Sequence, residues 1–100
     1  MSYTKYLKEG QVTIFSKSYC PFCTKTINLM KSKGVAYKVY EADLGELPDA
    51  DFAAMKQATG QNTVPNVFFG KTHVGGNDDT QSLAANGAKW QAMLAQNGFS

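Results

Sequence analysis

The two cysteines of the chain, Cys20 and Cys23, are separated by two residues in the motif CPFC. A disulfide between them would close so small a loop that it would hardly constrain the unfolded chain, which disfavours a purely structural bridge. A zinc site needs four ligands, or three and a water, and this pair with the lone His73 supplies them poorly. The remaining interpretations are a redox pair, or a pair of ligands shared between subunits.

The cysteines lie between a predicted strand and a predicted helix. Residues 11–16 (QVTIFS) are rich in β-branched and aromatic side chains, which is typical of a buried strand. Residues 23–33 are predicted to be helical, because Cys23, Ile27 and Met30 form one apolar stripe. A thiol at the N-terminus of a helix meets the positive end of the helix dipole, which favours the thiolate.

The two thiols are predicted to differ in reactivity. Cys20 precedes the first helical turn and can meet a substrate, whereas Cys23 lies on the apolar stripe, where burial raises the pKa of a thiol. We therefore expect Cys20 to attack and Cys23 to resolve. Lys17 would add positive charge near Cys20, and the fixed φ of Pro21 suits a first helical turn. A strand, a CxxC motif and a helix in this order favour redox chemistry over two incidental core thiols.

The rest of the chain alternates between helices and strands without repeats or linkers, which predicts one domain over residues 1–100. The further elements expected are a helix over 3–9, a strand over 35–42, a helix between Pro48 and Gly60, a hairpin of 67–69 with 72–74, a helix starting near Thr80 under a cap from Asp78 or Asp79, and a helix over 88–97. This order predicts a four-stranded mixed α/β sheet with its first two strands parallel and helices on both faces.

Composition narrows the classes of partner. The net charge is +2, and all ten basic residues are lysines. Because arginine is the usual residue for bidentate recognition of bases and phosphates, nucleic-acid binding is disfavoured. No apolar run approaches the ~20 residues that span a membrane, and residues 1–10 lack the apolar centre of a signal peptide. We expect a cytoplasmic monomer without nucleic-acid or membrane partners.

Three stretches together resemble the glutaredoxins, the glutathione-linked branch of the thioredoxin-like proteins: KSYCPFC at 17–23, TVP at 63–65 and GGNDD at 75–79. The resemblance covers nearly the whole chain and implies a thioredoxin-like fold. It also implies a glutathione-dependent oxidoreductase that reduces protein disulfides and glutathione mixed disulfides, with Cys20 as nucleophile and Cys23 as resolving thiol. Glutathione would be the reductant, and glutathionylated or disulfide-containing proteins would be the partners.

The resemblance further implies a glutathione site. Pro65 would be cis, and the backbone of Val64 would pair with the extended ligand. Glycines let a ligand approach the backbone, a helix N-terminus binds a carboxylate, and an Asp can receive an ammonium group, which suits the γ-glutamyl end. Lys17 and Gln57 match positions that contact the glycine carboxylate. The implied glutathione-binding residues are Lys17, Phe22, Gln57, Thr63, Val64, Pro65, Gly76, Asn77, Asp78 and Asp79.

Some alternatives stay open. Phe22 stands where many dithiol glutaredoxins carry tyrosine, so the ring is kept and one hydroxyl contact is lost. A thioredoxin is disfavoured, because that family usually carries CGPC. A glutathione-assisted [2Fe–2S] scaffold or carrier is the second alternative, and the stiff Pro21 argues against it; no metal is expected. His73 is expected to be structural, and the roles of Asp78 and Asp79 are left open.

Overall fold

The computed structural model describes residues 3–99, which form a four-stranded sheet in the order β2-β1-β3-β4. The strands are β1 (Val12–Ser16), β2 (Tyr37–Glu41), β3 (Asn66–Phe69) and β4 (Thr72–Gly75). β2 runs parallel to β1, whereas β3 is antiparallel to both β1 and β4. The predicted mixed sheet is confirmed, with its first two strands parallel.

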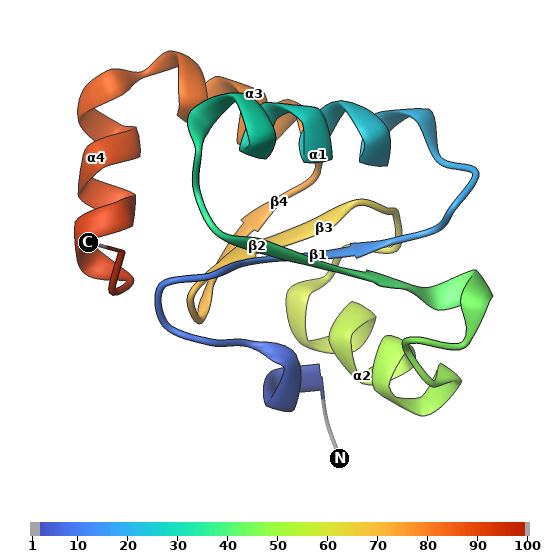
Figure 1. Ribbon diagram of the computed structural model, residues 1–100. Helices are drawn as coiled ribbons and strands as arrows, with labels where there is room; N and C mark the ends of the chain where they lie inside the picture. Colours follow the sequence, from blue (N-terminus) through green and yellow to red (C-terminus); the bar gives the residue numbers. More distant parts are fainter. Residues whose placement is uncertain (1–2, 100) are drawn as a thin grey trace.

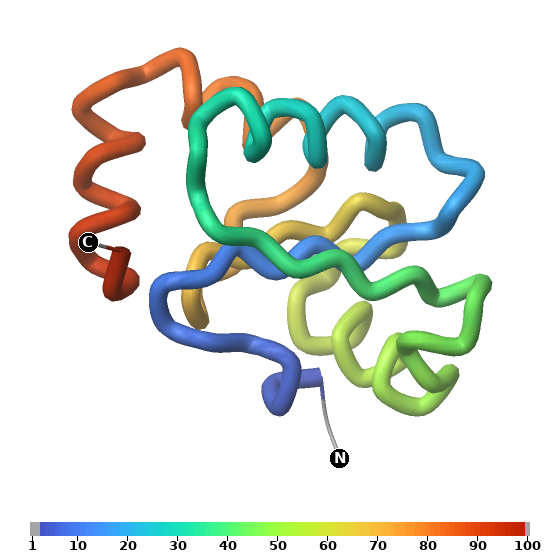
Figure 2. The backbone as a smooth tube through the Cα atoms, in the orientation of Figure 1, coloured from blue at the N-terminus to red at the C-terminus, as the bar shows by residue number. Residues whose placement is uncertain are grey.

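Helices cover both faces of this sheet (Figure 1). One face carries α1 (Pro21–Lys33) and α3 (Asn77–Ala85), which pack against each other. The opposite face carries α2 (Asp49–Thr59) and the short 3-10 helix η1 (Tyr3–Tyr6). A second 3-10 helix, η2 (Ala42–Leu44), follows β2, and α4 (Gly87–Gln96) stands at one end of the sheet, as the backbone trace shows (Figure 2). None of the helices within residues 3–99 has the length and apolar character to cross a bilayer.

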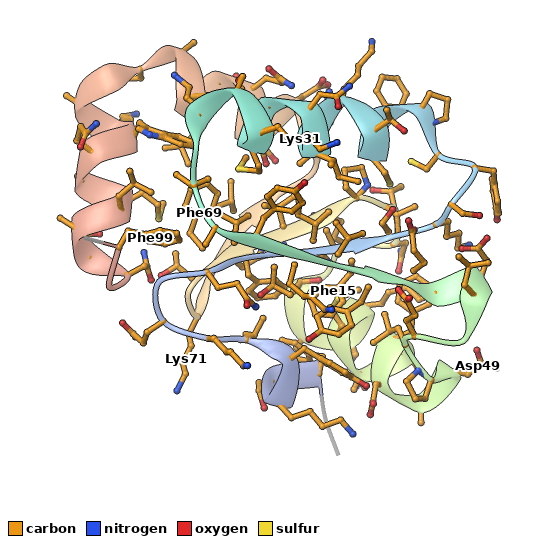
Figure 3. The ribbon with its side chains drawn as sticks, viewed as in Figure 1. Phe15, Lys31, Asp49, Phe69, Lys71 and Phe99 are labelled. Carbon is orange, nitrogen blue, oxygen red and sulfur yellow. The ribbon has the colours of Figure 1, made fainter. Side chains whose placement is uncertain are left out.

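The sheet separates two hydrophobic clusters because successive side chains of a strand point to opposite faces. Ile14 of β1 packs under α1 together with Met30 and Trp90, whereas the next residue, Phe15, packs against α2 with Met55. All five side chains are buried, and Phe15 lies at the centre of its layer (Figure 3). The helices α1 and α2 therefore pack against the same strand, β1, from its two sides.

Two helix starts differ from the sequence expectation. α1 begins at Pro21, two residues earlier than predicted, and Cys20 is its N-cap residue. α3 begins at Asn77 rather than near Thr80, and its N-cap is Gly76 without any side-chain cap, so the predicted aspartate cap is wrong. The physical reason is that β4 runs directly into the helix, which places both aspartates inside its first turn, where they interact with the helix dipole.

The two ends of the chain also differ in detail from expectation. The predicted helix over 3–9 is only the single 3-10 turn of η1, and Leu7 is buried immediately after it. The last helix begins at Gly87, because the side chain of Asn86 caps it by accepting a hydrogen bond from the backbone N–H of Lys89 at 3.1 Å.

Candidate active site

The two thiols sit at the junction of β1 and α1. Cys20 is partly exposed, whereas the side chain of Cys23 is only 1% exposed. The backbone N–H of Cys23 donates a hydrogen bond to Cys20 Sγ at 3.2 Å, so the sulfur of Cys20 caps the helix. The thiol of Cys20 in turn donates to the carbonyl oxygen of Val64 at 3.7 Å. The expected contrast between an accessible and a buried cysteine is what the structure has.

The electrostatics of Cys23 follow from its position. Burial first, and the hydrogen bond with Cys20 second, raise its pKa to about 11, although the contacts to Ser16 and Lys17 act in the opposite direction. Cys23 therefore stays protonated near neutral pH. Of the two thiols, Cys20 is the accessible one, and it has a helix N-terminus and a backbone donor at its sulfur.

The loop before β3 faces the nucleophile. The Val64–Pro65 peptide bond is cis, which confirms the expectation for Pro65. Gln61 holds this loop, because its Nε2 donates to the carbonyl oxygens of Thr63 at 2.9 Å and of Pro65 at 2.8 Å. Sequence reasoning missed Gln61; its place just before the TVP stretch was the available signal, but no periodicity distinguishes a bridging amide from a solvated one.

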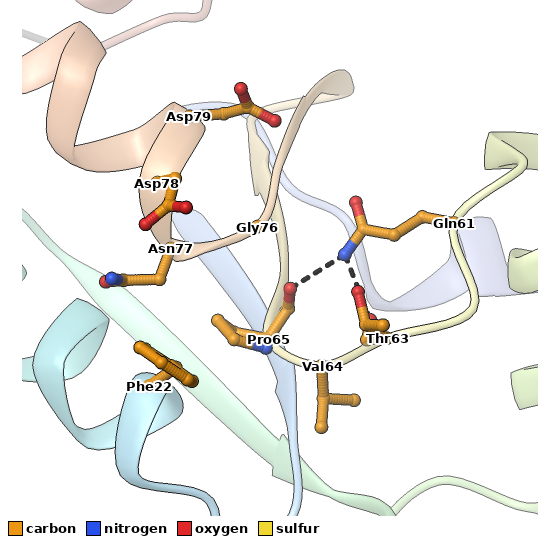
Figure 4. A pocket seen from close by; sticks show the side chains of 9 residues that line it. All are labelled: Phe22, Gln61, Thr63, Val64, Pro65, Gly76, Asn77, Asp78 and Asp79. Atoms are coloured by element: carbon orange, nitrogen blue, oxygen red, sulfur yellow. Dashed lines mark hydrogen bonds between the residues drawn. The ribbon is translucent and has the colours of Figure 1, made fainter.

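One pocket, of about 470 Å³, lies between this loop and the start of α3, and we call it the acidic pocket (Figure 4). Its lining comes from the N-terminus of α1, the cis-proline loop and the first turn of α3. The residues that line it are Phe22, Gln61, Thr63, Val64, Pro65, Gly76, Asn77, Asp78 and Asp79. The structure thus brings together all the implied glutathione-binding residues except Lys17 and Gln57.

The start of α3 shows why glycines precede the aspartates. Gly75 has a φ of +134°, a conformation that L side chains rarely adopt, and a Cβ there would collide with the carboxylate of Asp79. A Cβ on Gly76 would lie 3.6 Å from the carbonyl oxygen of Pro65. Of the two glycines, Gly76 lines the pocket and presents its backbone there without a side chain, beside the exposed carboxylates of Asp78 and Asp79.

Asn77 connects the pocket to α1. Its side-chain oxygen accepts hydrogen bonds from Thr26 Oγ1 at 2.9 Å and from Gln81 Nε2 at 3.2 Å. Both Thr26 and Asn77 are buried. The side-chain oxygen of Asn77 is thus engaged in holding α1 and α3 together, a role that sequence reasoning did not assign to Asn77 or to Thr26. In the sequence, Thr26 is a polar residue one helical turn after Cys23, next to the apolar stripe, and this position is the signal that its hydroxyl is buried.

A second pocket, of about 380 Å³, opens beside Cys20 itself, and we call it the lysine pocket. The residues that line it are Lys17, Tyr19, Cys20, Pro21, Phe52, Lys56, Asn62, Thr63 and Val64. It contains the expected Lys17, but α2 contributes Phe52 and Lys56 rather than Gln57. Gln57 is exposed and lines neither pocket, so its contact with a ligand stays a prediction.

The two pockets meet at Thr63 and Val64, directly opposite the nucleophile. One side offers carboxylates and a helix N-terminus, and the other offers ammonium groups, so a ligand that carries charge at both ends would be bound in one direction. His73 lies on β4 with its ring 5.0 Å from that of Phe68, in keeping with a structural role. Across residues 3–99, His, Cys, Asp and Glu form no group of three or more that could hold a metal ion.

Comparison with known proteins agrees with this geometry. The family model described as Glutaredoxin matches residues 12–74. A glutaredoxin of Ricinus communis is 42% identical over 88 residues, which cover 87% of this chain and 86% of that protein. The crystal structure of a wheat glutaredoxin superposes with a TM-score of 0.84 at 38% identity, covering 98% of this chain and 92% of the other.

A buckwheat glutaredoxin, whose structure was determined as a complex with glutathione, superposes with a TM-score of 0.77 at 36% identity, covering 89% of this chain and 81% of that one. The residues that match the family model include β1, β2, β3, the CPFC helix, the cis-proline loop and all of β4 except its last residue. The chain therefore belongs to the glutaredoxin family of thiol–disulfide oxidoreductases, within the thioredoxin-like superfamily.

Proposed function

We propose that this protein uses glutathione to reduce glutathione mixed disulfides and protein disulfides. The observation that carries the proposal is the position of Cys20: its sulfur caps α1, faces the carbonyl of Val64, and lies where an acidic and a lysine pocket meet. Glutathione carries an α-amine and an α-carboxylate at its γ-glutamyl end and a second carboxylate at its glycine end. The two pockets offer complementary groups for both ends.

The charges suggest how glutathione lies across the site. Its γ-glutamyl carboxylate would meet the backbone N–H groups at the start of α3, and its ammonium group would meet Asp78 or Asp79. Its cysteine would pair with the backbone of Val64, which brings the sulfur to Cys20. Its glycine carboxylate would meet Lys17.

The reaction on a mixed disulfide needs only Cys20. Its thiolate attacks the glutathione sulfur, a Cys20–glutathione disulfide forms, and the substrate protein leaves as a thiolate that takes up a proton. A second glutathione, after losing its thiol proton, attacks the glutathione sulfur of that intermediate. This releases oxidised glutathione and returns Cys20 as a thiolate, so one disulfide has been exchanged for another.

Cys23 is needed for a disulfide within a protein. Cys20 first forms a mixed disulfide with the substrate; Cys23 then loses its proton and attacks the sulfur of Cys20, which releases the second substrate thiolate. Because the pKa of Cys23 is about 11, its attack requires a proton acceptor, and the departing thiolate is one. Two glutathione molecules afterwards reduce the Cys20–Cys23 disulfide and leave as oxidised glutathione.

The test is turnover of a glutathionylated peptide, coupled to glutathione reductase and NADPH. Wild type and Cys23→Ser should both turn over, and Cys20→Ser should fall to the uncatalysed rate. Circular dichroism of each variant controls for folding. An inactive but folded wild type, or an inactive Cys23→Ser variant, would contradict the proposal. A brown, dimeric preparation with visible absorbance would instead favour the [2Fe–2S] carrier alternative.

A further inference from the structure

Three lysines are held against aromatic rings near the active site: Lys17 and Lys56 line the lysine pocket with Cys20, and Lys25 contacts Phe22 of the acidic pocket. The Nζ atoms of Lys17 and Lys56 lie 5.8 and 4.4 Å from the ring centroid of Phe52. In α1, the Nζ atom of Lys25 lies 5.2 Å from the ring centroid of Phe22. Such cation–π contacts attract the ammonium groups to the rings and so restrict the positions that these long side chains adopt.

Among residues 3–99, none of these three lysines forms an ion pair within 4 Å; the ion pair within that distance is that of Lys5 with Asp51. Asp43 feels the charge of Lys17, but hydrogen bonds from Ser18 are the main reason that its pKa is lowered. No acidic side chain lines the lysine pocket. We call Lys17, Lys25 and Lys56, with the rings that they contact, the rim of the site, and its charge is positive.

The same rim exposes aromatic surface. Tyr19 is 71% exposed and Phe22 is 54% exposed; Tyr19 directly precedes the nucleophile in the sequence, and Phe22 follows it by two residues. The remaining large hydrophobic side chain that is exposed in the described part of the chain is Leu44. Exposed rings that flank a reactive group are typical of a surface that contacts another chain.

We propose that this rim selects protein substrates whose glutathionylated cysteine is flanked by acidic residues, and that Lys56 is its main specificity-determining residue. The inference rests on the proposed function. In that reaction the glycine carboxylate of glutathione is expected at Lys17, which leaves Lys56 and Lys25 without a partner from glutathione. When Cys20 attacks the glutathione sulfur, the substrate sulfur leaves on the far side of that atom, so the substrate chain lies over the rim.

The experiment compares three glutathionylated peptides that differ only in the residues beside the modified cysteine: glutamate, serine or lysine. We measure kcat/KM for wild type, Lys56→Gln and Lys25→Gln. Lys33→Gln is the matched control, because Lys33 also lies over a ring, that of Trp90 at 5.3 Å, but at the far end of α1, roughly 18 Å along the helix from Pro21.

Wild type should prefer the acidic over the serine peptide roughly 3- to 10-fold, as expected for one or two partly screened charge pairs. Lys56→Gln should reduce the preference below about 2-fold, Lys25→Gln should reduce it less, and Lys33→Gln should leave it unchanged. Raising the ionic strength from ~0.05 to ~0.5 M should also weaken it, because the Debye length then falls well below 10 Å.

Three results would overturn the inference: no acidic preference in wild type, an equal loss on all three peptides in Lys56→Gln, or an equal effect of Lys33→Gln. A further arm replaces glutathione by its glycine monoethyl ester. If the ester removes the effect of Lys56→Gln, that lysine serves glutathione and not the substrate chain. The mixed disulfide of glutathione with 2-mercaptoethanol, whose leaving group is small and uncharged, tests the proposed function separately. Its turnover, without any acidic preference among the peptides, rejects the inference alone, and no turnover rejects both.

Discussion

The two pockets beside Cys20 place their charges by different means. In the acidic pocket the carboxylates of Asp78 and Asp79 stand on short side chains in the first turn of α3, next to a backbone that two glycines leave open. In the lysine pocket the charges sit at the ends of long side chains, and a ring contact with Phe52 directs them. The first arrangement is set by backbone geometry, whereas the second can adjust.

This difference fits two kinds of ligand. Short side chains and backbone N–H groups on a rigid element define one orientation, which suits a small molecule that is the same in every turnover. Long lysine side chains tolerate changes of several ångströms in the position of an anion, which suits partners that vary. We interpret the acidic pocket as the site for the constant γ-glutamyl end of glutathione and the lysine pocket as the adaptable side.

The strongest test of this comparison is at the acidic pocket. Of the pockets found among the described residues, Asp78 lines only the acidic pocket. Asp79 also lines a neighbouring pocket together with His73, and it packs against Gly75. We expect Asp78→Asn to raise the KM for glutathione roughly tenfold or more, because a charge-assisted hydrogen bond to the ammonium group is lost, and Asp79→Asn to raise it less. Steady-state kinetics measure both. The reverse order would assign the ammonium group to Asp79.

A second test is the buried link between α1 and α3. Thr26→Val keeps the shape of the side chain but removes the donor to Asn77, which retains only the hydrogen bond from Gln81. We expect the free energy of unfolding to fall by about 1–2 kcal/mol and the KM for glutathione to rise several-fold, because the rigid pocket loses its brace. Urea denaturation and kinetics measure these quantities.

The control for that test is Thr26→Ser, which keeps the hydroxyl and should recover the KM. If Thr26→Val lost stability but left the KM unchanged, the link would be structural and the rigidity of the acidic pocket would not depend on it.

The smallest expected effect is at the lysine pocket. Lys17→Gln should raise the KM for glutathione only about 2- to 5-fold, because Lys17 is partly exposed and its charge is screened by water. The effect should shrink at high salt and be absent with the glycine monoethyl ester of glutathione. A loss as large as that of Asp78→Asn would contradict the idea that this side is the adaptable one.

Several features of the site follow from the sequence with little help from packing. The order strand, CxxC, helix places a thiol at a helix N-terminus whatever the rest of the fold does, because chain connectivity alone determines it. The position of Cys23 on the apolar stripe predicts that it is the buried cysteine of the pair, and the structure confirms this, because its side chain is 1% exposed. The cis proline followed from family resemblance and not from physical reasoning, since TVP without that resemblance predicts only a turn.

Other features depend on how side chains turn in the folded protein. Lys56 and Gln57 are neighbours in α2, yet only Lys56 lines a pocket with Cys20. Successive residues of a helix point about 100° apart, so which of them reaches the site depends on how α2 is rotated about its axis. That rotation is set by Met55, which is buried in the cluster under β1.

The sequence by itself determined the fold class and the contrast between the two cysteines, because these rest on short-range order along the chain, whereas most residues of the acidic pocket were implied by the resemblance to the glutaredoxins. Only the tertiary structure decided that Gly76 caps α3, that Gln61 holds the cis-proline loop, and that Asn77 reaches Thr26, 51 residues away. The contact of Asn77 with Thr26 joins segments distant in sequence. It and the hydrogen bonds of Gln61 depend on the direction of a polar side chain, which no periodic pattern of hydrophobic residues specifies.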